Sequence, residues 1–321
     1  MDVLKEIGLR GIVPVIALNR AEDAVPLAKA LCAGGLPVAE VTFRTAAAED
    51  SIRAISRELP GMILGAGTVL TVEQAERAAA AGAKFIVCPG FNPTVVDYCI
   101  AHHIPVTPGV NSPSQVEQGL ERGLKVLKFF PAEASGGTAM LKALAGPYKN
   151  MKFIPTGGVN PDNMSDYLKL ANVHAVGGSW MVKNDLIAAG AFDKIEAMVR
   201  DAVMKLHGFK MVHIGVNAPN PDEAMKAAQA FAALFGFAID DRGAKSVFAS
   251  PEVEIMKNPG RGAKGHIAIA CRNVDRAVAY LEGKGVKMVP DTAKTNPDGS
   301  LKFIYMDLDF CGFAPHLTEY K

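Results

Sequence analysis

The sequence predicts an α/β protein in which a (β/α)8 TIM barrel is followed by a smaller α+β module of paired βαβββ repeats. Three observations support this fold class. Short β-rich runs alternate with Ala-rich helical stretches over residues 11–180, which is typical of parallel strands joined by crossover helices. The pattern then changes at Gly208. Beyond it, two segments repeat each other at a constant offset of 53 positions, which indicates an internal duplication. We therefore predict two domains, residues 1–207 and 208–321.

Eight β-rich runs carry the predicted barrel strands. Most of the helical segments between them end in Gly or Ala-Gly, a common helix stop. Eight such units are what a (β/α)8 barrel requires. An open doubly wound sheet is the alternative, although no G-x-G-x-x-G follows the first strand. The predicted strands are residues 12–17, 38–43, 63–67, 85–88, 105–107, 126–130, 153–156 and 174–177. The predicted helices are residues 21–32, 46–58, 71–81, 93–101, 114–122, 139–145, 161–170 and 192–207.

The composition excludes several functional classes. Hydrophobic residues make up 49% of the chain and charged residues 21%, with a net charge of +1. This balance lacks the basic footprint of a nucleic-acid partner. The five cysteines include no C-x-x-C pair, which favours a reducing, cytoplasmic setting. Residues 1–10 lack the apolar core of a signal peptide, and no apolar run approaches membrane-spanning length, so we expect no membrane partner.

Lys128 is the only charged residue in the apolar run 126–130. Burial of an amine favours its neutral form, and the neutral amine is the form that attacks carbonyl groups. The alternative for a lone lysine is that its side chain extends past the end of the strand and reaches solvent. Its neighbours at the other strand ends therefore decide how Lys128 is interpreted.

Chemistry in a (β/α)8 barrel takes place at the carboxyl ends of the strands. Paired glycines, Gly157-Gly158 and Gly177-Gly178, follow predicted strands seven and eight. Their amides can approach an anion closely because no Cβ intervenes, and these are the phosphate-binding positions of such a barrel. An ordinary tight turn is the alternative for each pair alone. Glu40 is the only carboxylate within the eight predicted strands.

Five short motifs lie at the predicted strand ends of the first domain. They are Glu40-Val-Thr-Phe-Arg-Thr45, Gly65-Ala-Gly-Thr-Val69, Lys128-Phe-Phe-Pro-Ala-Glu133, Pro155-Thr-Gly-Gly158 and Gly177-Gly-Ser-Trp180. Together they resemble the class I aldolases that act on 2-keto-3-deoxy-6-phosphogluconate (KDPG) and 4-hydroxy-2-oxoglutarate (KHG). The resemblance covers about residues 1–207. One departure is Cys88, because Ser commonly precedes Pro-Gly at this point of the family pattern.

The resemblance implies reversible cleavage of KDPG, KHG or both to pyruvate and an aldehyde, which is glyceraldehyde 3-phosphate or glyoxylate. It implies a Schiff base on Lys128, a general acid/base role for Glu40, no cofactor for the aldolase, a homotrimer and a place in the Entner–Doudoroff pathway. The chemistry agrees, because a protonated imine accepts the electrons of the breaking carbon–carbon bond while a carboxylate takes the hydroxyl proton. By the same motifs, Arg44 and Thr68 bind the carboxylate. The expected substrate-binding residues are Arg44, Thr68, Pro89, Phe130, Thr156, Gly157, Gly158, Gly177, Gly178 and Ser179.

A second reading of the first domain is a sugar-phosphate isomerase barrel. Such an enzyme would use the same phosphate cradle but would not need Lys128 as a nucleophile. In this reading, the C-terminal module is regulatory or structural. Trapping of a pyruvate imine with borohydride distinguishes the two.

The second domain contains the duplication. Residues 212–216 match residues 265–269, and residues 220–224 match residues 273–277. Each copy predicts a strand, a helix that opens at an Asn cap, and three further strands. These further strands are residues 237–240, 246–249 and 253–257 in the first copy, and residues 286–289, 302–307 and 313–318 in the second.

This paired pattern resembles the vicinal oxygen chelate superfamily, which includes glyoxalase I and extradiol dioxygenases. The family takes its metal ligands from the first and last strands of each copy, and the matching positions are His213, Glu254, His266 and His316. His316 stands where a glutamate is usual. Strand alternation places His316 and Thr318 on one face of the last strand. Three imidazoles and one carboxylate favour a divalent transition metal such as zinc, nickel, iron or manganese. The alternative is a metal-free binding or oligomerisation module.

Overall fold

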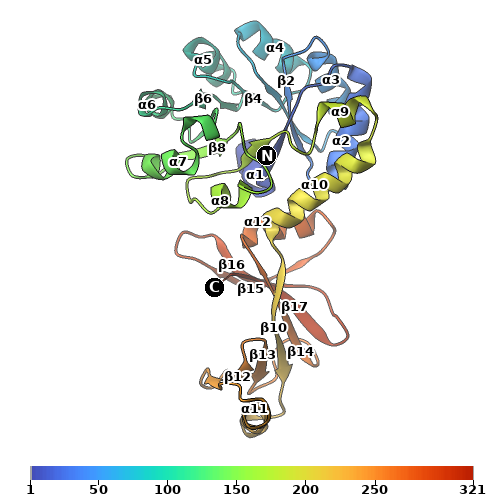
Figure 1. Cartoon of the computed structure of the whole chain (residues 1–321), viewed down its shortest axis with the longest axis vertical. Helices are drawn as coiled ribbons and strands as arrows, with labels where there is room; N and C mark the ends of the chain where they lie inside the picture. The colour runs from blue at the N-terminus through green and yellow to red at the C-terminus, as the bar shows by residue number, and fades with distance from the viewer. Residues whose placement is uncertain (1, 321) are drawn as a thin grey trace. The chain divides into compact units, whose positions relative to one another are not determined.

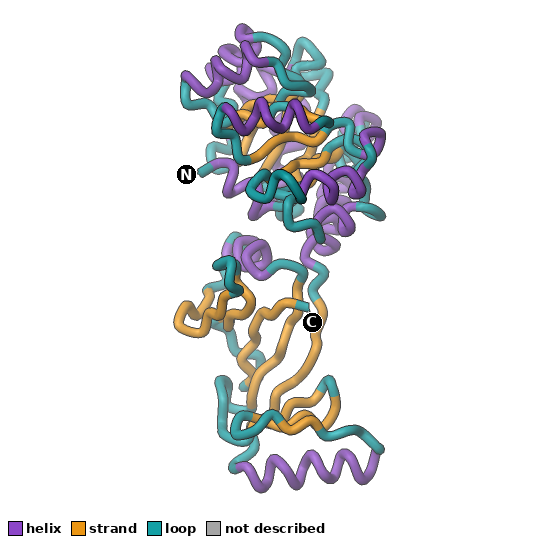
Figure 2. Tube along the Cα trace, turned by 90° about the vertical axis from the view of Figure 1, so that its left-hand side faces the viewer, coloured by secondary structure: helices purple, strands orange, loops and turns teal. Residues whose placement is uncertain are grey.

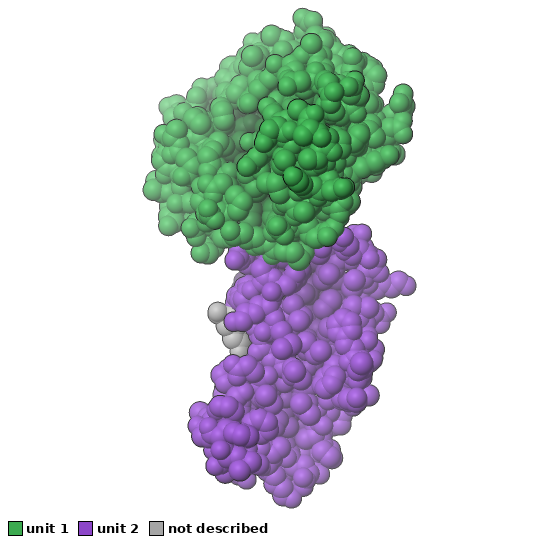
Figure 3. All heavy atoms as spheres, turned by 45° about the vertical axis from the view of Figure 1, so that its right-hand side comes forward, with its two compact units in different colours: residues 1–206 green, residues 207–321 purple. Residues whose placement is uncertain are grey.

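A computed structural model describes residues 2–320 of the chain. The chain forms two compact units, which are residues 1–206 and residues 207–321 (Figure 3). Among the described residues, we find no helix with both the length and the apolar character needed to cross a membrane.

Parallel strands form the centre of the first unit, and helices surround them (Figures 1 and 2). The strands are β1 (Ile12–Ile16), β2 (Val38–Thr42), β3 (Ile63–Gly67), β4 (Phe85–Val87), β5 (Val106–Thr107), β6 (Gly109–Val110), β7 (Val126–Phe129), β8 (Lys152–Pro155) and β9 (Val176–Gly178). Six of them pair in the order β5-β4-β3-β2-β1-β9, and the other three in the order β6-β7-β8.

The strand predicted over residues 105–107 is β5, and a further short strand, β6, follows it after Pro108. Proline has no amide hydrogen to donate to a neighbouring strand, so it interrupts the ladder. Just after the end of β8, an isolated parallel bridge joins Thr156 to Gly177 of β9. The pairing therefore shows a parallel α/β fold made of two sheets, and closure of all strands into one barrel stays a prediction.

Some helices of the first unit begin where the sequence provides a capping side chain. The side chain of Thr71 accepts a hydrogen bond from the backbone amide of Gln74, and that of Asn92 accepts one from Thr94, as N-cap residues do. The helices are α1 (Val3–Arg10), η1 (Ala21–Asp23), α2 (Ala24–Ala33), α3 (Ala48–Glu58), α4 (Val72–Ala80), α5 (Pro93–Ala101), α6 (Pro113–Glu121), η2 (Glu133–Ser135), α7 (Gly137–Ala145), α8 (Met164–Leu168), α9 (Asn184–Ala188) and α10 (Phe192–His207).

Helices α1 and α9 were not predicted. Helix α1 begins at Asp2, whose side chain accepts a hydrogen bond from the amide of Lys5, and it buries Ile7 completely. Ile7 lines a small space that Lys128 and Glu40 also line, so α1 helps to enclose the interior in which these two residues lie.

The second unit is mostly sheet. One eight-stranded mixed sheet carries two helices, and each half follows the predicted order of strand, helix and three strands (Figure 1). The elements are β10 (Lys210–Asn217), α11 (Pro221–Phe235), β11 (Asp240–Asp241), β12 (Ser246–Ser250), β13 (Val253–Met256), β14 (Gly265–Cys271), α12 (Val274–Glu282), β15 (Met288–Thr295), β16 (Leu301–Met306) and β17 (Phe313–Glu319). The strand order is β11-β12-β13-β10-β14-β17-β16-β15. Asn220 and Asn273 cap the two helices, as the duplicated motif predicts.

Two predicted strands of the second unit were wrong in their bounds. The strand predicted over residues 237–240 is reduced to β11, because Phe237 and Ile239 are exposed and do not form the buried face that stabilises a strand. Strand β15 is longer than predicted and contains Pro290. An edge strand tolerates proline because its outer amides need no partner.

Candidate active site and candidate metal centre

Strands β2 and β7 bring Glu40 and Lys128 together in the interior of the first unit. The Lys128 Nζ donates a hydrogen bond to the Glu40 Oε1 at 3.2 Å. The two side chains are only 6% and 4% exposed, so Lys128 does not extend to solvent. A carboxylate thus lies directly beside the Lys128 amine, in addition to the apolar surroundings that the sequence predicts.

Glycine residues make room for this pair. A Cβ atom at Gly67 would lie 2.1 Å from the Glu40 Oε1, a distance that side-chain atoms do not tolerate. Gly67 therefore explains part of the Gly-Ala-Gly motif in β3. A space of about 10 Å³ beside the pair is also lined by Thr107 and Thr156, which is about the volume that one water molecule needs.

Arg44 and Thr68 lie together at the ends of the adjacent strands β2 and β3. The Arg44 Nε donates a hydrogen bond to the Thr68 Oγ1 at 3.1 Å. Thr68 has a φ of 54°, a conformation that costs a β-branched residue energy and that clusters at functional sites. The arrangement presents a guanidinium whose remaining donors can bind a carboxylate in a bidentate manner.

An open cavity of about 650 Å³ lies at the carboxyl ends of the strands. Most of the predicted substrate-binding residues line it, but Thr68, Pro89 and Gly177 do not. Gly177 packs beneath the cavity, since a Cβ atom there would lie 2.2 Å from the Thr156 Oγ1. The Pro89 carbonyl packs in the same way against Gly109. The predicted residues that line the cavity are Arg44, Phe130, Thr156, Gly157, Gly158, Gly178 and Ser179.

Four polar or aromatic residues that follow Ser179 also line the cavity, although they were not predicted from the sequence. They are Trp180, Lys183, Asn184 and Asp185. Trp180 is the last residue of the motif Gly177-Gly-Ser-Trp180, but the motif does not indicate that its ring packs over Gly178. The other three follow β9 at its carboxyl end, which is the general signal that could have identified them.

The segment after β7 holds the glycine loop in place. The backbone amides of Ala132 and Glu133 donate hydrogen bonds to the carbonyls of Thr156 and Gly157, at 2.8 and 3.0 Å. Gly157 and Gly158 have φ values of 97° and 86°, which glycine adopts without strain. These hydrogen bonds hold the loop in place, so that its glycine backbone lines the cavity.

Cys88 is buried next to the ion pair. Burial raises the pKa of its thiol to about 12, so the thiol stays protonated near neutral pH. Since the thiolate is the nucleophilic form, Cys88 packs at the site without competing with Lys128 for a carbonyl group.

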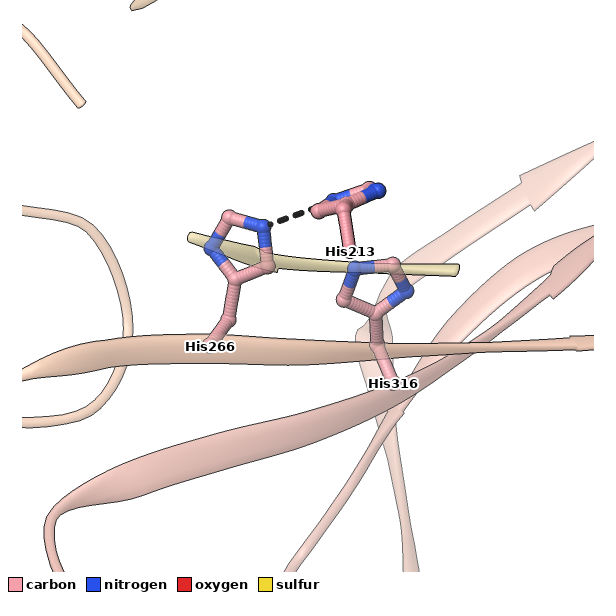
Figure 4. Close-up of side chains that lie close together, drawn as sticks. All are labelled: His213, His266 and His316. Carbon is pink, nitrogen blue, oxygen red and sulfur yellow. Dashed lines mark hydrogen bonds between the residues drawn. The ribbon is translucent and has the colours of Figure 1, made fainter. Parts of the chain in front are cut away.

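In the second unit, strand register places all four predicted metal ligands on one face of the sheet. Gly215 pairs with both Glu254 and His266 on its two sides. One row further along, Ala268 pairs with His213 and with His316. Directly paired residues share a face, as do residues two apart, so β10, β13, β14 and β17 each contribute one side chain to the same place. Figure 4 shows the three imidazole rings gathered together.

The donor atoms of these residues converge. The Nε2 atoms of His213 and His266 lie 3.1 Å apart, and each lies 3.2 Å from the Glu254 Oε2. One ligand atom from each histidine lies within 4.8 Å of the others, including His316. Ligands held at about 2.0–2.2 Å from a tetrahedral metal ion lie about 3.3 Å from one another, so the spacings among His213, His266 and Glu254 suit one metal ion.

The electrostatics of the cluster also suit a cation. Burial disfavours the charged form of Glu254, but hydrogen bonds from His213, His266 and Ser246 outweigh this effect and hold its pKa below the ordinary value. Burial lowers the pKa of His316 to about 3. A carboxylate and neutral imidazoles are the forms that bind metals.

A cavity of about 700 Å³ extends along the same face from His213. Its lining includes Phe237, Phe248, Arg242 and Thr318. Of the four predicted ligands, His213 lines this cavity, while Glu254, His266 and His316 are buried.

Comparisons with known proteins concern the first unit. The family model for KDPG and KHG aldolases matches residues 3–198. The 2-dehydro-3-deoxy-phosphogluconate aldolase of Treponema pallidum is 54% identical over 187 residues, which are 58% of this chain and 89% of that protein. The KDPG aldolase of Legionella pneumophila, solved with pyruvate captured as a covalent carbinolamine, superposes with a TM-score of 0.61 at 40% identity, over 62% of this chain and 97% of that one. The Zymomonas mobilis KDPG aldolase, solved with 3-phosphoglycerate, gives a TM-score of 0.59 at 38% identity, over 63% and 95%.

Proposed function

The chain belongs to the KDPG and KHG aldolase family and is a carbon–carbon lyase, and from this premise we propose that its first unit cleaves KDPG, KHG or both through a Schiff base on Lys128. The observation that carries the proposal is the buried contact between Lys128 and Glu40 beneath a cavity at the strand ends. The covalent carbinolamine of the Legionella relative supports the same chemistry.

Each step has a group in place to perform it. The Lys128 amine attacks the C2 carbonyl, and loss of water gives a protonated imine. Glu40 takes the proton of the C4 hydroxyl while the C3–C4 bond breaks, so the aldehyde leaves and the bonding electrons move to the iminium nitrogen as an enamine. Protonation of the enamine at C3 and hydrolysis of the imine release pyruvate and restore Lys128. In this scheme, Arg44 holds the pyruvate carboxylate in a bidentate contact.

Retro-aldol cleavage of both acids tests the proposal. Purified protein should release pyruvate from KDPG, KHG or both, and borohydride with pyruvate should add mass to the peptide that contains Lys128. Lys128→Ala should abolish labelling and turnover. The nearby Lys125 and Lys152 serve as internal controls, and label on either one would contradict the assignment. Isomerisation of a sugar phosphate without trapping would instead favour the isomerase reading.

For the second unit, we propose a vicinal-oxygen-chelate-like module that binds one divalent transition metal through His213, Glu254, His266 and His316. The convergence of the three histidines, with the Glu254 Oε2 3.2 Å from the Nε2 atoms of His213 and His266, supports the proposal. When bound, such an ion would act as a Lewis acid toward oxygen atoms of a ligand. Glu254 is already oriented by the hydroxyl of Ser246, which donates a hydrogen bond to its other oxygen at 2.5 Å, an arrangement typical of metal-binding carboxylates.

Elemental analysis after reconstitution tests the metal proposal. The wild type should retain close to one equivalent of zinc, nickel, iron or manganese, and the double variant His213→Ala/His266→Ala should retain far less. Equal metal in both proteins would contradict the proposal. Removal of the metal should leave aldol cleavage nearly unchanged, because a Schiff-base route needs no cation.

We also propose that the strands of the first unit close into one barrel, that residues 1–207 and 208–321 act as separate domains, and that the protein is a cytoplasmic homotrimer. Strands β5 and β6, which pair with β4 and β7 on the two sides of Pro108, and the bridge between Thr156 and Gly177 support closure. The trimer rests on the family resemblance alone, and the mass of the native assembly in solution tests it.

A further inference from the structure

The glycine loop, Gly157-Gly158, forms part of the wall of the cavity in the first unit. Thr156, directly before the loop, lines both this cavity and the small space beside Lys128 and Glu40. In the proposed cleavage, the pyruvate half of the substrate is held at Lys128, so the aldehyde half must extend along the cavity wall. The position of the glycine loop therefore affects how the aldehyde half binds.

The glycine loop has little conformational restraint of its own. Gly157 and Gly158 adopt φ values of 97° and 86°. Glycine loses more conformational freedom on folding than any other residue, so entropy opposes the ordering of a loop made of two glycines. Contacts from outside the loop must therefore fix it. Such ordering before a ligand arrives strengthens binding.

Glu133 packs directly against the glycine loop. A Cβ atom at Gly158 would lie 2.4 Å from the Glu133 Cγ and 2.7 Å from its Cβ, so the stem of the Glu133 side chain fills the space beside Gly158. The backbone amide of Glu133 also donates its hydrogen bond to the Gly157 carbonyl. Glu133 is an exposed residue, but its carboxylate is held in place, because Oε1 accepts a hydrogen bond from the Tyr167 hydroxyl.

Tyr167 anchors this carboxylate from the interior of the first unit. It belongs to α8, and its side chain is completely buried. Burial, together with the hydrogen bond to Glu133, raises the pKa of the Tyr167 hydroxyl to about 13, so the hydroxyl remains a donor near neutral pH. Gly137 leaves room for the contact, since a Cβ atom there would lie 3.2 Å from the Tyr167 hydroxyl oxygen. A hydrogen bond to a carboxylate is stronger than one between neutral groups.

Helix α8 supports the glycine loop at a second point. The side-chain amide of Asn163 donates a hydrogen bond to the Gly158 carbonyl at 3.1 Å. The backbone amide of Tyr167 in turn donates to the Asn163 carbonyl at 3.3 Å. The segment after β7, the glycine loop and the start of α8 are thus joined in one network, in which Glu133 lies between Tyr167 and Gly158.

We propose that the hydrogen bond from Tyr167 to Glu133 fixes the glycine loop in the conformation that binds the aldehyde half of the substrate, so that Glu133 and Tyr167 are positioning residues of the aldolase. This inference rests on the aldol cleavage proposed above. In the described structure, both side chains lie outside the cavity lining, so they act through the loop. The pyruvate half, held at Lys128 and Arg44, should not depend on them.

Cleavage kinetics and pyruvate trapping, measured on the same preparations, test the proposal. The substrate is whichever of KDPG and KHG the wild type cleaves faster. We expect Tyr167→Phe to lower kcat/KM about 10-fold, mainly through KM. This loss is smaller than the roughly 10²-fold that a displacement of about 1 Å can cost, because the backbone hydrogen bonds to the loop remain. Borohydride trapping of pyruvate on Lys128 should proceed at the wild-type rate.

Variants of Glu133 separate positioning from a general effect on folding. Glu133→Gln keeps both the stem beside Gly158 and an oxygen that accepts from Tyr167, so it should keep most of the activity. Glu133→Ala removes both and should behave like Tyr167→Phe. The double variant Tyr167→Phe/Glu133→Ala should lose no more than Glu133→Ala alone, because the two residues act through one contact.

Tyr148→Phe is the matched control. It removes another Tyr–Glu hydrogen bond, in which the Tyr148 hydroxyl donates to the Glu117 Oε1 at 3.0 Å, and Tyr148 lies outside the cavity lining of the described structure. This variant should keep the wild-type kcat/KM.

Unchanged kcat/KM in both Tyr167→Phe and Glu133→Ala would overturn the proposal. An equal loss of cleavage and of pyruvate trapping, or independent losses that multiply in the double variant, would also overturn it. If Tyr167→Phe does not fold, the Glu133 variants decide the outcome, because Glu133 is exposed. Wild-type protein that cleaves neither acid and traps no pyruvate would instead overturn the aldolase proposal itself.

Discussion

The Lys128 Nζ lies 3.2 Å from the Glu40 Oε1, although 88 positions separate the two residues in the chain. Both side chains are buried, so each charge depends on the other for compensation. A buried ammonium–carboxylate pair at the bottom of an open cavity is an arrangement in which one group can form a covalent bond while its partner moves protons.

Glu40→Gln should remove the proton acceptor for the carbon–carbon step. We expect turnover to fall by about 10² to 10⁴, while a pyruvate imine still forms at a measurable rate on Lys128. Retro-aldol kinetics and borohydride trapping on the same preparation measure both properties. Full activity in this variant would assign the proton transfer to another group.

Gly67→Ala should impair catalysis without touching either charged residue. The new Cβ atom would lie 2.1 Å from the Glu40 Oε1, so the carboxylate must move away from its place beside Lys128. A displacement of about 1 Å at a reacting group can cost about 10²-fold in rate. The matched control is Gly61→Ala, where no atom lies within 4 Å of the added methyl. Similar activity in the two folded variants would show that the position of Glu40 is not critical.

Gly215→Ala should weaken metal binding in the second unit. The added Cβ atom would lie 2.0 Å from the His266 Cε1, which forces the ring out of the cluster. The proposal therefore predicts a loss of most bound metal by elemental analysis. Gly260→Ala is the control in the same unit, since its nearest neighbours would be 3.7 Å away. If both variants hold as much metal as the wild type, the ligand geometry proposed here is wrong.

His207 should make the second unit sensitive to acid. Burial, with a smaller contribution from Arg276, lowers the pKa of His207 from 6.5 to about 4. Its Nδ1 is buried without a hydrogen-bond partner in the described structure, and its ring stacks on Phe209 and packs against Tyr280. Between pH 6.5 and 4, the unfolded state binds more protons at this residue, so the free energy of unfolding decreases as the pH falls.

His207→Phe keeps an aromatic ring in this stack and removes the titrating group. We expect it to abolish on the order of 2–3 kcal/mol of the stability loss between pH 7 and pH 4. Urea unfolding at several pH values, followed by hydrogen exchange in peptides from residues 207–321, measures the difference. The same pH dependence in wild type and variant would show that His207 does not contribute.

Much of the local structure was predictable from the sequence. The alternation of β-rich and helical runs located the parallel strands of the first unit, and the Asn caps at the 53-residue offset located both helices of the second. These features follow from periodicity and capping, which act over a few residues. Local signals did not predict the elements whose formation depends on long-range packing. Residues 237–239 have a strand-like composition but bury no face, whereas β15 forms at a sheet edge despite Pro290.

Which side chains meet depends on the tertiary structure. Glu40 and Lys128 each had a chemical rationale in the sequence, but strand packing sets the 3.2 Å between them. The register of four strands likewise places His213 and His316 on the same face. Lys183 carried no motif, and it lines the cavity because strand order brings β9 beside β1. Distances of this kind depend on how elements far apart in the chain pair and pack, and no local pattern records that information.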